Sequence, residues 1–78
     1  LAVASDGRRL YTANEDSATV TAIDVASRQV VGRVDVGVEP EGIAVSPDGT
    51  IVAVTSETSN MVHFIDAAKL EVPAIRDV

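Results

Sequence analysis

The chain has 78 residues, a formal net charge of −6, no cysteine and one histidine. A chain of this length forms at most one small domain, and without cysteine it has neither a disulfide framework nor a thiolate metal site. The acidic charge without a basic stripe argues against nucleic acid binding, and the apolar runs are too short to cross a membrane. The sequence begins at Leu1 without a methionine, so we expect a cut or processed end.

Short strands are predicted along the whole chain, because segments rich in Val, Ile and Thr alternate with turn residues. In chain order they are expected at 1–4, 9–14, 19–24, 29–36, 43–46, 51–55, 61–66 and 71–78. The Asp-Gly pairs at 6–7 and 48–49 are typical of tight turns, since aspartate accepts a backbone hydrogen bond and glycine adopts positive φ. Asp24 and Asp66 end strands and are expected to accept turn N–H groups. A helical turn at 66–70 is the alternative there, but so short a helix is not stable alone.

The sequence repeats itself after 42 residues. In that register Asp6-Gly7 falls on Asp48-Gly49 and Ile23-Asp24 falls on Ile65-Asp66. A period of this length is typical of one four-stranded blade of a β-propeller. We therefore predict an all-β fold of two four-stranded antiparallel propeller blades, the first at 1–36 and the second at 43–78, joined by an interblade loop at 37–42.

The repeat also resembles a known family. Tyr-Thr-Ala-Asn at 11–14 stands where the YVTN family of propeller repeats has its naming motif, and Ser-Pro-Asp-Gly at 46–49 matches that repeat too, whereas 53–56 departs from it. Val-Glu-Pro-Glu-Gly at 38–42 and the segment 55–66 resemble the propeller proteins associated with PQQ-dependent catabolism. This resemblance implies a seven-bladed periplasmic propeller beside quinoprotein alcohol oxidation, with no known reaction. The repeats are also similar to surface-layer propellers and to the d1-haem propeller of nitrite reductase.

The strands of a blade run alternately up and down, so loops 15–18, 37–42 and 57–60 are expected at one end of the propeller. Polar loops on a rigid scaffold often carry binding residues, so this end is the candidate binding face. Its candidate residues are Glu15, Asp16, Glu39, Glu41, Glu57, Asn60 and His63. The acidic residues suit a cationic ligand or a basic protein such as a cytochrome c. The alternatives are carboxylates that only maintain solubility and a calcium site with an oxygen from Asp16 or Glu57.

His63 is the only imidazole, and Thr21 takes its place in the first repeat. It is either a ligand or proton-transfer group near the loop-rich end or a histidine between blades that is hydrogen-bonded to neighbouring backbone; the second interpretation is favoured. Glu39 and Glu41 flank Pro40 at the expected mouth of the central channel, where two exposed acids are favoured over an acid–base pair. No serine has a suitable histidine partner, so no catalytic residue is assigned, and neither a cofactor nor a metal is expected.

The predicted function is a non-catalytic binding or assembly scaffold, accessory to periplasmic quinoprotein alcohol oxidation. The alternative is a segment of a propeller enzyme that holds a cofactor or metal on its axis, of the quinoprotein or d1-haem kind. The innermost strands, at 1–4 and 43–46, carry no reactive side chain, which favours the scaffold. The expected partners are the remaining blades of a longer chain or identical subunits in a ring. A longer chain is favoured, because seven blades cannot be built from identical pairs.

Overall fold

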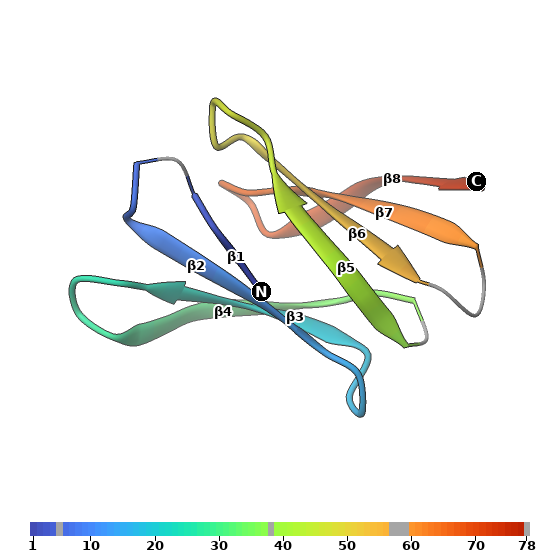
Figure 1. The fold of residues 1–78 in the computed structure, drawn as a ribbon, viewed down its shortest axis with the longest axis horizontal. Coiled ribbons are helices and arrows are strands. Elements are labelled where there is room, and N and C mark those ends of the chain that lie inside the picture. The colour runs from blue at the N-terminus through green and yellow to red at the C-terminus, as the bar shows by residue number, and fades with distance from the viewer. Residues whose placement is uncertain (5, 38, 57–59, 78) are drawn as a thin grey trace.

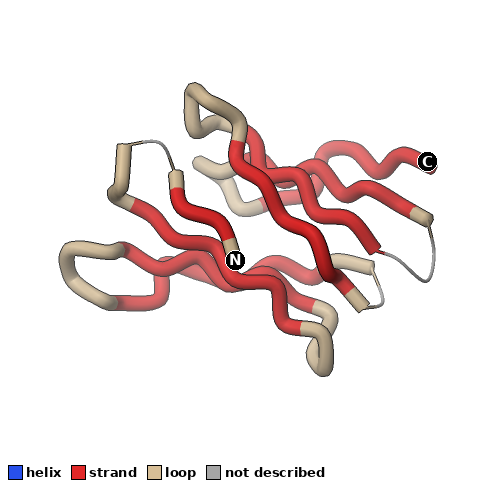
Figure 2. The backbone as a smooth tube through the Cα atoms, in the orientation of Figure 1, coloured by secondary structure: helices blue, strands red, loops and turns tan. Residues whose placement is uncertain are grey.

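The computed structural model describes residues 1–4, 6–37, 39–56 and 60–77. The described residues form two four-stranded antiparallel sheets, β1-β2-β3-β4 and β5-β6-β7-β8, in which each strand pairs with its neighbour in sequence (Figures 1 and 2). The strands are β1 (Ala2–Val3), β2 (Arg9–Asn14), β3 (Thr19–Asp24), β4 (Gln29–Asp35), β5 (Pro40–Val45), β6 (Ile51–Ser56), β7 (Met61–Asp66) and β8 (Glu71–Asp77). The prediction of an all-β fold with two antiparallel blades is confirmed, and residues 67–70 form a turn and not a helix.

The largest difference from the expected strands is at β5. We expected this strand to begin at residue 43, but it begins at Pro40, which pairs with Ser56 at the end of β6. Proline is compatible with the first position of a strand, where its missing N–H costs no ladder hydrogen bond. The register shifts between Pro40 and Gly42, so Glu41 is the extra residue of a β-bulge, a feature that bends a strand.

The 42-residue repeat is present in the backbone as well as in the sequence. Positive φ angles recur at matched positions, which pair as Gly7 with Gly49, Ala18 with Asn60, and Arg28 with Leu70. The Arg28 N–H donates to the Asp24 carbonyl oxygen at 2.8 Å, and the Leu70 N–H donates to the Asp66 carbonyl oxygen at 2.7 Å. The paired side chains differ at two of the three positions, so the repeat preserves turn geometry even where it does not preserve the residue.

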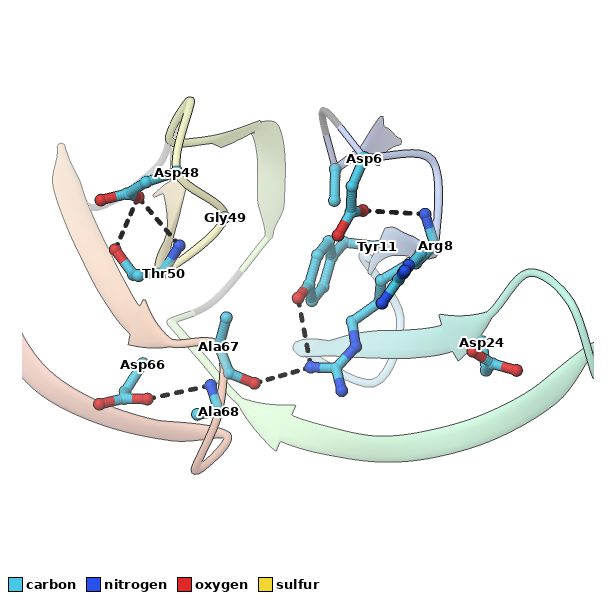
Figure 3. A pocket seen from close by; sticks show the side chains of 12 residues that line it. Asp6, Arg8, Tyr11, Asp24, Asp48, Gly49, Thr50, Asp66, Ala67 and Ala68 are labelled. Carbon is cyan, nitrogen blue, oxygen red and sulfur yellow. Dashed lines mark hydrogen bonds between the residues drawn. The ribbon is translucent and has the colours of Figure 1, made fainter.

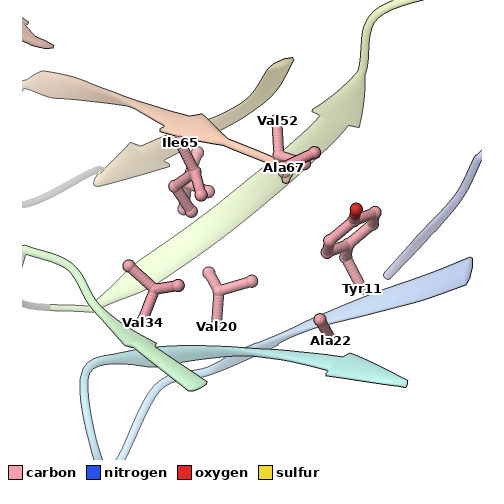
Figure 4. Close-up of a cluster of buried hydrophobic side chains, with 8 residues drawn as sticks. Tyr11, Val20, Ala22, Val34, Val52, Ile65 and Ala67 are labelled. Carbon is pink, nitrogen blue, oxygen red and sulfur yellow. The ribbon is translucent and has the colours of Figure 1, made fainter. Parts of the chain in front are cut away.

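Tyr11 and smaller aliphatic side chains fill the space between the two sheets (Figure 4). The buried core consists of Tyr11, Val20, Ala22, Val34, Val52, Val54, Ile65 and Ala67. Gly32 makes room for a side chain of the other blade, because a Cβ added there would lie 2.6 Å from Leu70 Cδ1. Leu70 of the second blade therefore packs into the space that Gly32 leaves in the first blade.

The connections lie at two ends of the stacked sheets (Figure 1). We name one end the loop face; among the described residues it carries 15–18, 36, 37, 39 and 60. We name the opposite end the turn face; it carries the connections after β1, β3, β5 and β7. β5 lies close to β1 and β2, as expected when β1 and β5 are the innermost strands of adjacent blades.

Candidate functional site

The loop face carries exposed carboxylates. Glu15 and Asp16 lie in the β2–β3 connection, Glu39 and Glu41 lie at the entry to β5, and all four side chains are exposed. Asn60 is also exposed and precedes β7. The described positions of the loop-face connections include no lysine or arginine. The structure thus brings five of the candidate residues to one end, while Glu57 lies outside the described residues.

His63 lies between the two blades and is only 7% exposed. On β7 it pairs with the core residue Val54 of β6, so the two side chains share the sheet face that meets the first blade. A Cβ added to Gly37 would lie 2.7 Å from His63 Cε1 and 2.9 Å from Ser56 Oγ. The expected interblade position is therefore found, but His63 Nδ1 has no hydrogen-bond partner in the described structure, and neither does Ser56 Oγ.

A groove of about 560 Å³ opens on the turn face between the blades (Figure 3). It is lined by residues of both Asp-Gly turns, by Asp24 at the end of β3, by the start of the turn that follows β7, and by Arg8, Arg9 and Tyr11. The candidate site predicted from the sequence lies at the opposite end, and this groove is not part of that prediction. The sequence does contain one signal for this groove. Arg8 and Arg9 follow the first Asp-Gly turn, whereas the second repeat has the uncharged Thr50 and Ile51 at the matched positions.

The aspartates of the groove accept hydrogen bonds from their own turns. Asp48 Oδ1 accepts from the Ser46 and Thr50 hydroxyls, both at 2.7 Å, and from the Thr50 N–H at 3.1 Å. These bonds, with the Ser46 hydroxyl first, lower the pKa of Asp48 to about 2. The Ser27 hydroxyl, at 2.6 Å, and then the Ser27 N–H lower the pKa of Asp24. Hydrogen bonds that stabilise the carboxylate are the physical cause in both turns.

Arg9 connects the two blades within this groove. Its Nη1 donates to the Ala67 carbonyl oxygen at 2.7 Å and to Tyr11 Oη at 3.4 Å (Figure 3). The side chain is half-buried, whereas Ile51 at the matched position of the second repeat is 45% exposed. The polar groups of the groove therefore serve turns and the interblade contact, and their arrangement supports structure better than catalysis.

The described residues contain no group of three or more His, Cys, Asp or Glu side chains that could hold a metal ion. Haem iron is usually held by histidine, methionine, cysteine or tyrosine, and the innermost strands β1 and β5 contain none of these. Residues of these types lie on other strands: Tyr11 is on β2, and Met61 and His63 are on β7. Across the described ranges, no helix is long and apolar enough to cross a bilayer.

Comparison with known proteins gives one family. The family model of the cytochrome D1 heme domain matches residues 1–77. A search of the curated proteins finds no match. The chain is similar to the solved structure of Kuenenia stuttgartiensis hydrazine synthase, with 31% identity, a TM-score of 0.96, and coverage of 99% of this chain and 22% of that one.

Two further solved structures have the same fold. The dihydro-heme d1 dehydrogenase NirN, in complex with DHE, is 30% identical with a TM-score of 0.85, over 94% of this chain and 16% of that one. U3-55K is 13% identical with a TM-score of 0.87, over 97% of this chain and 25% of that one, and shows the fold alone. The chain thus spans a quarter or less of each of these structures.

The comparisons support the propeller part of the family resemblance but not its YVTN and PQQ-associated parts. The d1-haem propeller, expected from the sequence as a similar fold and within the alternative function, is the one that the family model matches.

Proposed function

Because the chain belongs to the cytochrome D1 heme domain family, we propose that the protein is a haem-type β-propeller in which this chain forms two adjacent blades. The family match over residues 1–77 carries this proposal. It favours the cofactor-bearing alternative of the sequence analysis over a scaffold for quinoprotein alcohol oxidation. The domain of this family has eight blades, so we propose a ring of eight in place of the seven that the PQQ-associated resemblance implied.

Within that ring, these two blades are proposed to form part of the wall and to supply no iron ligand. A ligand on the axis comes from an innermost strand or from the connection that leads into it. The described residues there are Leu, Ala, Val, Pro, Glu, Gly and Ile, and none of these types is a usual haem ligand. His63 is 7% exposed on the third strand of its blade. These residues therefore do not fit an iron-binding role, and the ligands are assigned to blades outside this chain.

The test is the absorption spectrum of the full-length protein that carries this chain, purified from its native host. We expect one tetrapyrrole per propeller, measured by absorbance and extraction. His63→Phe, Tyr11→Phe and Met61→Leu are each expected to leave the iron spectrum unchanged. Protein that holds no tetrapyrrole and takes up no added d1 haem would overturn the haem proposal. A changed spectrum in one of the three variants would overturn only the wall assignment.

The location proposed for the protein is the periplasm, as expected for this family. Fusion of alkaline phosphatase to the full-length protein tests it, because the enzyme becomes active only after export. An inactive fusion of normal abundance would contradict the proposal.

The exposed acids of the loop face favour a second candidate function, the docking of a basic protein such as a cytochrome c. Glu15 and Asp16 are exposed on the same face as Glu39 and Glu41, and complementary charge accelerates association at low salt. Binding of a basic cytochrome c to the full-length protein is measured at low and at high salt. The double variant Glu15→Gln/Asp16→Asn should weaken the low-salt affinity. Equal affinity for wild type and variant would exclude these two residues from the docking face.

A further inference from the structure

Two buried polar atoms lie at the loop-face end of the space between the blades. Ser56 is 1% exposed and His63 is 7% exposed. Ser56 Oγ and His63 Nδ1 have no hydrogen-bond partner among the described residues. A buried polar group without a partner destabilises a folded protein, and native structures usually satisfy such groups with protein or with an ordered water.

Both side chains converge on one short backbone segment. The position of a Cβ on Gly37 is 2.9 Å from Ser56 Oγ, 2.7 Å from His63 Cε1 and 3.3 Å from His63 Nε2. The serine hydroxyl and the Cε1–Nε2 edge of the imidazole therefore approach the same point from β6 and β7. Nδ1 is bonded to Cε1, so it is the next atom of the ring beside this point. Gly37 belongs to the connection that leads from β4 of the first blade into β5 of the second, so all three residues meet where one blade passes into the next.

In the first repeat, the polar side chains at the matched positions form hydrogen bonds with each other. Asn14 and Thr21 are the residues matched to Ser56 and His63 by the 42-residue repeat. Asn14 Nδ2 donates to Thr21 Oγ1 at 2.7 Å and to Thr19 Oγ1 at 3.2 Å. The asparagine amide is long enough to reach across the strand pair, whereas the serine hydroxyl is shorter and makes no such bond.

We propose that Ser56 Oγ and His63 Nδ1 form a binding site for one buried water molecule at the junction of the two blades. Water is small, and it can donate to one atom and accept from the other, whichever ring nitrogen of His63 carries the proton. Buried waters are typical where otherwise unpaired polar groups come together. This inference does not depend on the haem proposal.

A crystal structure of the full-length protein, at a resolution that reveals ordered water, tests the site directly. We expect one water within hydrogen-bonding distance, about 2.7–3.2 Å, of both Ser56 Oγ and His63 Nδ1. A direct bond between the two side chains, or no water at either atom, would overturn the proposal.

The sign of a stability change provides an independent test. Ser56→Ala removes one partner of the water, so the melting temperature of the full-length protein should fall. If the site is dry, the same change removes an unsatisfied hydroxyl and the melting temperature should rise, which also overturns the proposal. Ser17→Ala is the matched control, because Ser17 is exposed and its hydroxyl forms only a solvent-exposed hydrogen bond with Thr19 Oγ1 at 2.7 Å among the described residues. Its loss should change the melting temperature little.

Discussion

Two residues of this chain show how single positions support its fold. One acts through the absence of a side chain, and the other through hydrogen bonds within a turn. Gly37 allows the chain to pass beside Ser56 and His63, where a Cβ has no space. Asp48 organises its turn by accepting three hydrogen bonds at one oxygen atom. The steric role and the electrostatic role can each be tested by a single substitution.

Gly37→Ala should destabilise the full-length protein by about 1–3 kcal/mol, because the added methyl group overpacks a closed site. Chemical denaturation measures the free energy of unfolding. His63→Ala in the same chain should recover part of the loss, because it removes the ring that the methyl group meets.

The control for that experiment is Gly7→Ala. Gly7 has a φ of 71° and no atom within 4 Å of an added Cβ, so its cost of roughly 1–2 kcal/mol is backbone strain. His63→Ala should not recover it. Equal recovery at both glycines would contradict the steric explanation of Gly37.

The pKa of Asp48, about 2 in the folded protein against its ordinary value of 3.8, predicts a pH dependence of stability. Since the folded pKa is the lower one, the contribution is present above pH 3.8 and is lost as the pH falls toward 2. Asp48→Asn should flatten this part of the curve of unfolding free energy against pH. Ser46→Ala removes the leading hydrogen bond and should raise the pKa of Asp48. If the unfolding free energy of wild type and of Asp48→Asn falls in the same way as the pH is lowered, Asp48 is not the source of this pH dependence.

At the scale of elements, the two sheets are held by side chains that cross between them. Leu70, in the turn after β7, packs over Gly32 of β4. Arg9, at the start of β2, donates to the Ala67 carbonyl oxygen after β7. Each contact joins segments that are far apart in sequence, so stacking of the blades is specific as well as hydrophobic.

Arg9→Met should lower the free energy of unfolding by about 1–3 kcal/mol, because it keeps an apolar stem but removes a charged hydrogen-bond donor. Arg8→Met is the matched control: Arg8 is exposed, and its replacement should change stability by no more than about 0.5 kcal/mol. Similar losses for the two variants in denaturation experiments would show that the Arg9 contact has no special role.

At the scale of the whole molecule, the outer faces of the two sheets retain apolar side chains in contact with solvent. Val3 is 56% exposed and pairs with Leu10 on the face opposite Tyr11, while Ile51 is 45% exposed on the outer face of the second sheet. In a closed propeller, neighbouring blades cover such faces. Apolar patches left uncovered favour association.

The isolated 78-residue chain is therefore expected to self-associate in size-exclusion chromatography with light scattering. Val3→Lys and Ile51→Lys should each reduce the association, because each places a charge on one of the open faces. A compact monomer that melts cooperatively would contradict the requirement for neighbouring blades.

Much of the candidate site could be placed from the sequence, and the reason is topological. Alternating strand directions put Glu15, Asp16, Glu39 and Glu41 at one end, and the structure has their connections there. The bulge at Glu41 could not be anticipated, because it depends on how Pro40 and Gly42 pair with the end of β6. The turn-face groove was missed, because it forms between turns of two different sheets.

The sequence by itself determined the repeat, the strands and the turns. These follow from local chemistry: β-branched residues favour strands, Asp-Gly pairs favour tight turns, and a period of 42 residues marks blade-sized units. Only the tertiary structure decided which side chains meet between the sheets. The bond from Arg9 to Ala67 joins residues 58 positions apart, and the convergence of Gly37, Ser56 and His63 requires three segments from two blades. No local pattern encodes the relative placement of two sheets, because that placement is set by how their side chains pack.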